Sequence, residues 1–84
     1  MYFVYLLKSK IDSSLYIGYT EDLKKRLFQH NDKQNTSTKN KVPYELVYCE
    51  VYKAKSDAKY RESNLKKFAR AYGQLKRRIK NSLI

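Results

Sequence analysis

The sequence predicts a small α/β domain of the α+β type, in which helices flank a three-stranded antiparallel sheet in the order β-β-α-β-α-α. First, 84 residues suffice for one domain, residues 1–84, with one hydrophobic core. Second, three short segments are rich in aromatic and β-branched residues, as strands are. Third, apolar residues recur at helical spacing toward the C-terminus. Two glycines and one proline exclude a collagen-like or low-complexity chain.

The first two strands are predicted at residues 2–7 and 15–20. Residues 2–7 are a continuous apolar run, which is typical of a strand covered on both faces and central in its sheet. This run lacks a basic lead-in and a small-residue cleavage site, so it is a strand rather than a signal peptide. The polar residues 8–14 then connect the two strands as a hairpin.

A helix is predicted next, with Thr20 as its N-cap and an end near His30. The carboxylates of Glu21 and Asp22 fall in the first turn, where they complement the helix dipole. Residues 31–42 carry polar and basic side chains and are expected to form a solvated basic loop.

The third strand is predicted at residues 45–52, with Val47, Cys49 and Val51 on one face. Alternation of this kind is typical of a half-buried strand.

Two helices are predicted after it, at residues 57–71 and 74–82, with Ser56 as the N-cap of the first. Gly73 interrupts an otherwise continuous helical stripe, so the division is expected there. The apolar positions of the stripe are Leu65, Phe68, Tyr72, Leu75 and Ile79.

The net charge of +11 arises from 19 Lys and Arg against eight Asp and Glu, and it indicates a polyanionic partner such as DNA or RNA. No apolar window is long enough to span a bilayer, so a soluble domain is expected and no membrane partner. The single cysteine, Cys49, cannot form an internal disulfide, and one Cys with one His cannot build a zinc site. A reducing, cytoplasmic location fits these features best.

Arg26 and His30 are the first candidate site residues. Taking Leu23 and Leu27 as the inward direction, Arg26 lies about 60° and His30 about 20° from Leu23 on the helical wheel. A guanidinium and an imidazole one turn apart suit phosphate binding and proton transfer. Alternatively, Arg26 extends over the edge of the core and His30 is a packing residue.

Glu62 is the only carboxylate close to the apolar stripe of the following helix. A partly desolvated carboxylate needs a cationic partner or a metal ion. One carboxylate with water and phosphate oxygens is an ordinary Mg²⁺ environment. An ion pair with Arg61 or Lys66 is the alternative, and from the sequence alone it is the simpler one.

Nine tyrosines, with no tryptophan, are unusual, and most of them are expected to fill strand and helix faces. Tyr5 and Tyr16, on the two predicted hairpin strands, are the candidates for chemistry. Because a phenol titrates near pH 10, either could act as a base only if cations or a metal ion stabilised its phenolate.

Four segments in order resemble the GIY-YIG endonuclease domain, and most closely its small single-domain bacterial members. The first signature is degenerate, because it lacks its glycine and isoleucine, whereas the second is intact, with ten residues between the two signature tyrosines. The segments are Val4-Tyr5-Leu6, Tyr16-Ile17-Gly18, the helix of residues 22–30 and the stretch of residues 58–62.

The resemblance implies metal-dependent hydrolysis of DNA phosphodiester bonds. Tyr5 and Tyr16 would line the site, with Tyr5 as the preferred base. Arg26 would hold the scissile phosphate. His30 would relay the proton or orient a tyrosine, and Glu62 would bind one Mg²⁺ or Mn²⁺ ion.

Substrate contacts are expected from Gly18 and from basic residues. Without a Cβ, Gly18 would let the backbone or the substrate approach closely. No separate DNA-binding domain remains in the chain, so specificity would be loose, set by DNA structure or provided by a protein partner, in DNA repair or recombination. The basic residues expected at the substrate are Lys24, Lys25, Lys39, Lys41 and Lys66.

The competing hypothesis is a catalytically inactive basic module that binds DNA or RNA. It predicts salt-sensitive binding that needs no metal ion and survives removal of the candidate site residues.

Overall fold

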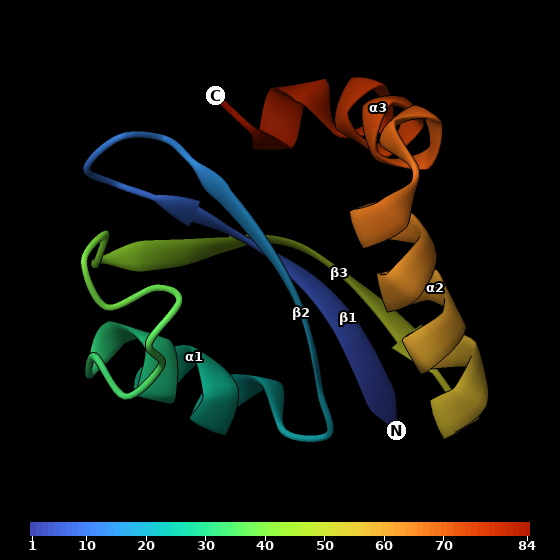
Figure 1. The fold of residues 1–84 in the computed structure, drawn as a ribbon, viewed down its shortest axis with the longest axis horizontal. Coiled ribbons are helices and arrows are strands. Elements are labelled where there is room, and N and C mark those ends of the chain that lie inside the picture. The colour runs from blue at the N-terminus through green and yellow to red at the C-terminus, as the bar shows by residue number, and fades with distance from the viewer.

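The computed structural model describes residues 1–84, and the elements follow the predicted order (Figure 1). The sheet and three helices are succeeded by a short 3₁₀ helix at the C-terminus. The elements are β1 (Tyr2–Ser9), β2 (Leu15–Thr20), α1 (Leu23–Asn31), β3 (Tyr44–Tyr52), α2 (Lys55–Lys67), α3 (Ala69–Arg78) and η1 (Lys80–Ser82).

The sheet has the strand order β2-β1-β3, and both neighbours of β1 pair with it antiparallel. The prediction that the first strand is central is therefore confirmed. Its apolar run is covered on both faces: Val4, Tyr5, Leu6 and Leu7 are each at most 2% exposed.

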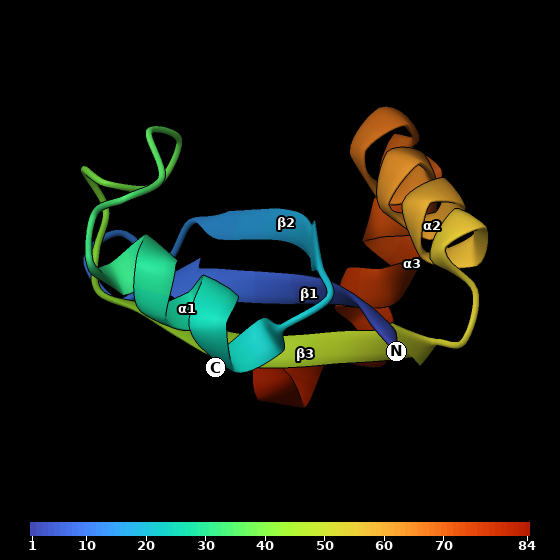
Figure 2. The ribbon, with the colours of Figure 1, turned by 90° about the horizontal axis from the view of Figure 1, so that it is seen from below.

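The two faces of the sheet are covered by different helices (Figures 1 and 2). On one side, which we call the α1 face, Tyr5 and Leu7 of β1 pack with Leu23 and Leu27 of α1. On the other side, the α2 face, Val4 and Leu6 pack against α2 and α3. The buried helix residues of this second cluster are Ala58, Leu65, Leu75 and, just after α3, Ile79.

The N-cap of α1 is Asp22 rather than the predicted Thr20. Asp22 Oδ1 accepts a hydrogen bond of 3.1 Å from the backbone N–H of Lys25. Thr20 is still paired with Phe3 in the sheet, so its backbone cannot begin a helix. Its hydroxyl instead bonds the backbone N–H and C=O of Asp22 and fixes the strand-to-helix turn.

Val47 does not lie on the sheet face predicted for it, because the pairing register shifts within β3. Leu6 pairs with Tyr48 and Leu7 pairs with Leu46, so Val47 is the extra residue of a bulge. Val47 consequently packs on the α2 face, whereas Cys49 packs on the α1 face.

The break between the last two helices falls at Phe68 and not at Gly73. Phe68 is extended (φ −115°, ψ 108°), whereas Gly73 lies inside α3 with a negative φ. The turn at Phe68 lets residues of both helices reach one apolar cluster. The predicted cap is also wrong, because α2 begins after Ala54 and includes Ser56. No helix has the length and apolar composition needed to cross a membrane.

Candidate active site

Two tyrosines and the single histidine gather on the α1 face, from three different elements. Tyr5 on β1 and His30 on α1 share a buried hydrogen bond of 2.8 Å between the Tyr5 hydroxyl and His30 Nε2. The Tyr16 ring on β2 meets the imidazole edge-on, with 4.9 Å between ring centroids. The Tyr5 and Tyr16 rings lie 6.4 Å apart, so the three side chains form one cluster.

Gly18 makes room for the Tyr5 ring. The two residues are cross-strand partners, and a Cβ at Gly18 would lie 2.2 Å from both Cζ and the hydroxyl oxygen of Tyr5. The space that a side chain at this position would need is therefore filled by the Tyr5 phenol. The absence of a Cβ at Gly18 thus allows this phenol to reach His30.

A second hydrogen bond fixes the other side of the imidazole. His30 Nδ1 lies 2.7 Å from the Thr38 hydroxyl, and both residues are 0% exposed. The expectation of a wholly solvated loop over residues 31–42 is therefore wrong at Thr38. Sequence analysis missed this residue because one threonine in a polar segment carries no periodic signal.

The protonation states of this cluster follow from its burial. Desolvation, together with the nearby Arg26 guanidinium, lowers the pKa of His30 below its ordinary 6.5, which favours a neutral imidazole at neutral pH. Desolvation raises the pKa of Tyr5 to about 12, although the Arg26 guanidinium acts in the opposite direction. In this state a protonated phenol faces a neutral imidazole.

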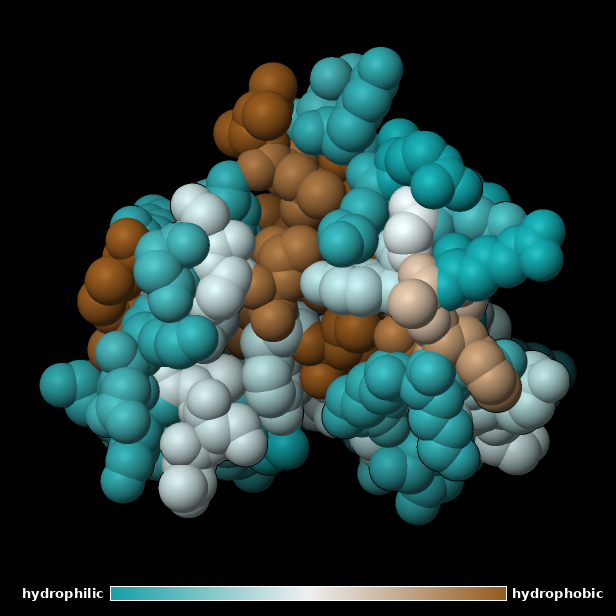
Figure 3. Space-filling model, turned by 45° about the horizontal axis from the view of Figure 1, so that its top comes forward, coloured by the Kyte–Doolittle hydropathy of each residue, from teal (hydrophilic) through white to brown (hydrophobic).

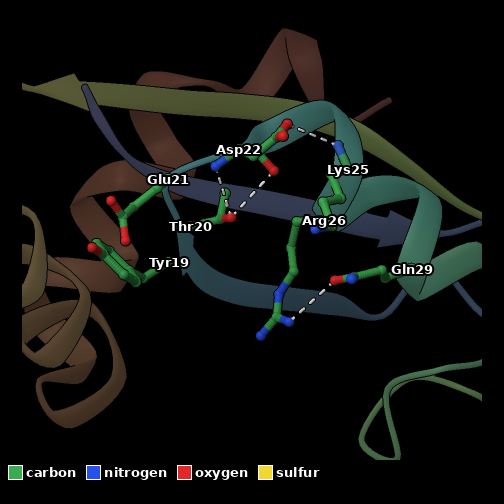
Figure 4. Close-up of a pocket in the computed structure, with 7 residues that line it drawn as sticks. All are labelled: Tyr19, Thr20, Glu21, Asp22, Lys25, Arg26 and Gln29. Atoms are coloured by element: carbon green, nitrogen blue, oxygen red, sulfur yellow. Dashed lines mark hydrogen bonds between the residues drawn. The ribbon is translucent and has the colours of Figure 1, made fainter.

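Arg26 extends from α1 into an open groove that runs past β2 (Figure 4). Its Nε is buried without a hydrogen-bond partner, and Nη1 has only a long contact of 3.5 Å to Gln29. Arg26 lines two adjoining hollows of about 390 and 200 Å³, and His30 lines the smaller. A half-buried guanidinium with unused donors is suited to hold a phosphate.

Glu62 lies on α2, which covers the opposite face of the sheet, and it does not line the groove of Arg26. Desolvation is the main cause of the raised pKa values of Tyr5 and Tyr19, and the Glu62 carboxylate adds the smallest contribution to each. Tyr19 lines the groove of Arg26, and its ring lies 4.4 Å from Lys59 Nζ. Because Lys59 in turn pairs with Glu62, Tyr19 at the rim of the groove is linked to Glu62 through this lysine.

The Glu62 carboxylate is held by two lysines. Lys66 Nζ lies 2.9 Å from Oε2 and Lys59 Nζ lies 3.7 Å from Oε1, and the Glu62 side chain is 15% exposed. Of the two ion-pair partners considered for it, Lys66 is thus present. Arg61 instead makes a bidentate contact with Glu50 of β3.

The donor set fits a metal ion that is held mainly by water and substrate. No three His, Cys, Asp or Glu side chains come together as a ready-made metal site. A single partly exposed carboxylate is nevertheless sufficient for Mg²⁺ when waters and phosphate oxygens complete the shell. Two ammonium groups at Glu62 show that this position attracts positive charge.

Of the basic residues expected at the substrate, only Lys25 lines the groove of Arg26. Lys25 lines it beside Arg26, whereas Lys24 borders an apolar hollow between α1 and β3. Lys39 is exposed in the loop that carries Thr38, and Lys41 pairs with Asp12 at 3.4 Å. The surface view in Figure 3 shows hydrophilic side chains around a band of apolar surface.

Comparisons with known proteins agree with this arrangement. A family model described as the GIY-YIG catalytic domain matches residues 1–80. UPF0213 proteins of Staphylococcus saprophyticus and Staphylococcus epidermidis are each 43% identical to this chain over 70 residues, covering 82% of this chain and 84% of the relative. The solution NMR structure of a UPF0213 protein from Bacillus halodurans is similar with a TM-score of 0.56 and 32% identity, covering 89% of this chain and 82% of that one.

Proposed function

Because this chain belongs to the GIY-YIG catalytic domain family, which points to the nucleases, we propose that it is a divalent-metal-dependent endonuclease hydrolysing DNA phosphodiester bonds. The observation that carries the proposal is the buried hydrogen bond between Tyr5 and His30, beside an Arg26 side chain with unused donors. A packing role for His30 would explain the phenol partner, since a buried imidazole needs hydrogen bonds, but it would not need an adjacent guanidinium with unused donors.

Proton transfer follows from the geometry of the pair. Hydrolysis forms a P–O bond to water and breaks the bond to one sugar oxygen, so the attacking water loses a proton and the leaving oxygen gains one. With a pKa of about 12, Tyr5 is a phenol rather than a phenolate at neutral pH. It can take the proton of water as its own proton passes 2.8 Å to His30 Nε2.

The tautomer of His30 makes this transfer possible. Nε2 accepts a proton only if it is unprotonated, which in a neutral imidazole places the hydrogen on Nδ1. Nδ1–H then donates to the Thr38 hydroxyl at 2.7 Å. Tyr16, packed edge-on against His30, holds the ring in place and orients the incoming water or phosphate.

Arg26 and Glu62 deal with the charge of the substrate. Arg26 binds the non-bridging oxygens of the scissile phosphate and stabilises the charge that develops on them. Glu62 would hold one Mg²⁺ or Mn²⁺ ion, which supplies Lewis-acid neutralisation of the phosphate and the leaving oxygen. Its two lysine partners must then release the carboxylate, and they remain close enough to meet phosphates.

The test is DNA cleavage by purified protein on plasmid and on branched DNA, with Mg²⁺, with Mn²⁺ and with EDTA. Arg26→Ala and Glu62→Gln should each lower the rate by more than about 100-fold, as expected for groups that stabilise the transition state. Lys10→Ala and Glu45→Gln, which change exposed residues outside the groove, are matched controls and should keep the wild-type rate. Equal cleavage by all variants would identify a contaminating nuclease and contradict the proposal.

A second candidate, a non-catalytic DNA- or RNA-binding module, is favoured by the ion pairs that occupy both Glu62 oxygens. It predicts binding in EDTA that Glu62→Gln leaves unchanged, with no strand scission under any metal condition. A metal-dependent product that disappears in Glu62→Gln excludes it.

A further inference from the structure

The C-terminal segment is the most cationic part of the chain, and none of its residues lines the groove of Arg26. Residues 66–84 contain no Asp or Glu and seven of the 19 Lys and Arg residues. Apart from Lys66, none of these seven cations forms an ion pair. The seven are Lys66, Lys67, Arg70, Lys76, Arg77, Arg78 and Lys80.

The cations of α3 are directed away from the core. Leu75 and Ile79 are buried in the apolar cluster of the α2 face, and Ala71 and Tyr72 pack against it. On a helical wheel, Arg70 and Arg77 fall opposite these residues, and both are exposed. They are seven residues apart, so they lie on one line about 10 Å apart along the helix axis.

The five cations of residues 70–80 differ in their surroundings, and three of them have no intramolecular partner. Lys76 Nζ lies over the Tyr72 ring at 4.5 Å, and Arg78 borders a hollow shared with Glu50. Arg70, Arg77 and Lys80 have no hydrogen bond or ion pair through their side chains and are exposed. We call these three residues the α3 surface.

We propose that the α3 surface is a second, non-catalytic binding site for the phosphate backbone of a nucleic acid, outside the cleavage groove. It rests on the proposed function only in taking nucleic acid as the partner. A row of exposed cations that form no ion pair complements a regular polyanion and gains affinity by releasing counterions.

The position of α3 makes contact with one substrate at both sites possible. Figures 1 and 2 show α3 continuing from the end of α2, on the side of the sheet away from α1. Lys66, which pairs with Glu62, is near the end of α2, and α3 begins at Ala69. A nucleic acid held at Glu62 can therefore extend along α3.

A lipid surface is the less suitable partner for this helix. A membrane-binding amphipathic helix inserts its apolar side among the acyl chains. The apolar side of α3 is already packed on the sheet, which leaves Phe68 at its start as the one large exposed apolar side chain next to its cations.

The experiment compares two triple variants that change the same number of charges. Arg70→Gln, Arg77→Gln and Lys80→Gln are combined in one variant, and Lys10→Gln, Lys53→Gln and Lys55→Gln in the control, and all six residues are exposed. Binding to a labelled DNA duplex is measured by fluorescence anisotropy in EDTA over a range of salt concentrations.

Each lost phosphate contact should reduce the magnitude of the slope of log affinity against log salt by about 0.9. The slope of the α3 variant should therefore be smaller than that of wild type by about 2 to 3. The control should lose clearly less. Equal slopes in the two variants, or no binding of wild type at low salt, would overturn the proposal. Phosphatidylserine vesicles that bind wild type but not the α3 variant, with unchanged DNA slopes, would also overturn it in favour of a membrane.

Cleavage is then measured in single turnover with Mg²⁺. The α3 variant should need more DNA for half-saturation, while its rate at saturation stays at the wild-type value. If wild type cleaves nothing, the proposed endonuclease function fails, but a selective loss of salt slope still supports the α3 surface.

Discussion

The α2 face and the α1 face of the sheet bury different kinds of side chain. On the α2 face the buried cluster is wholly apolar and includes Val4, Leu6 and Leu65. On the α1 face the side chains of His30 and Thr38 are fully buried as well, and they are joined by hydrogen bonds to each other and to Tyr5. Since buried polar groups stabilise a fold only weakly even when paired, we expect the α2 face to supply most of the stability, while the α1 face holds Tyr5 and His30, the groups proposed to transfer the proton.

Leu65→Ala should produce the largest effect, and it should act on stability alone. Leu65 is 3% exposed in the centre of the α2 cluster, so truncation should lower the free energy of unfolding by about 2–5 kcal/mol. Urea unfolding measures this loss, and Ile84→Ala, at a residue that is 97% exposed, should change it by less than about 0.5 kcal/mol.

If Leu65→Ala does not fold, Ile79→Val replaces it as the test, and it should lower the free energy of unfolding by about 0.5–1.5 kcal/mol. The cleavage rate per folded molecule should stay at the wild-type value in both variants. A large fall in that rate would show that the two faces are not separable in this way.

Gly18→Ala should destabilise the protein and also disrupt the polar cluster of the α1 face. The new Cβ would lie 2.2 Å from the Tyr5 phenol, so the ring must move, at a cost of about 1–3 kcal/mol. Loss of the Tyr5–His30 hydrogen bond should then lower cleavage by more than about 100-fold.

Gly73→Ala is the matched control for this change. Its Cβ would meet only the end of Arg77, at 3.8 Å, inside a helix. It should therefore stabilise the protein by about 0.5–1 kcal/mol. Gly18→Ala with wild-type stability and cleavage would contradict the role of Gly18 as the residue that makes room for Tyr5.

Local sequence patterns predict some features of this fold and miss others. The three strands and the inward position of His30 follow from local periodicity, which a sequence displays directly. The bulge at Val47 and the break at Phe68 depend on how elements distant in sequence pack into one core. No local sequence pattern therefore predicts them. Asp22 was expected in the first helical turn, and it caps the helix because the sheet retains Thr20.

For the candidate site, the sequence likewise predicts the residues but not all of their contacts. Tyr5, Arg26, His30 and Glu62 were selected by residue type and spacing, together with the resemblance to a family. What spacing could not supply was their partners: Thr38 is distant in sequence from Tyr5 and joins it only through the imidazole.

Thr38→Val tests whether this unpredicted hydroxyl positions the imidazole. The substitution keeps the shape of the side chain but leaves His30 Nδ1 without its partner, at an expected cost of about 1–2 kcal/mol in unfolding free energy. The tautomer preference should weaken, which ¹⁵N chemical shifts of the ring nitrogens measure, and single-turnover cleavage should slow. Thr38→Ser, which restores the hydroxyl, should recover both readouts, and an unchanged ¹⁵N pattern in Thr38→Val would refute a positioning role.

The pH dependence of stability should carry the signature of His30. Because burial lowers its folded pKa below the ordinary 6.5, the unfolded chain takes up a proton that the folded chain resists. The free energy of unfolding should therefore be highest above pH 6.5 and should fall as the pH decreases from there to the lower folded pKa.

His30→Gln should remove this slope. The depressed pKa values of Glu50 and Asp12 act in a lower window, below their ordinary values of 4.5 and 3.8, and should persist in the variant. A slope near pH 6 that survives in His30→Gln would assign it to another group.

Lys59→Gln should have the smallest effect on stability and metal affinity. It tests whether this lysine competes with a metal ion for Glu62. The Lys59 ammonium lies 3.7 Å from Glu62 Oε1 and its side chain is 54% exposed, so the pair contributes less than about 1 kcal/mol. Removing this competing cation should let Mn²⁺ bind up to about fivefold more tightly, as measured by electron paramagnetic resonance of the free ion. Lys55→Gln makes the same charge change on an exposed α2 residue without a contact to Glu62, so it should leave Mn²⁺ affinity nearly unchanged. Equal tightening in both variants would mean that net charge alone governs metal binding, and weaker binding in Lys59→Gln would mean that this lysine supports Glu62 instead of competing for it.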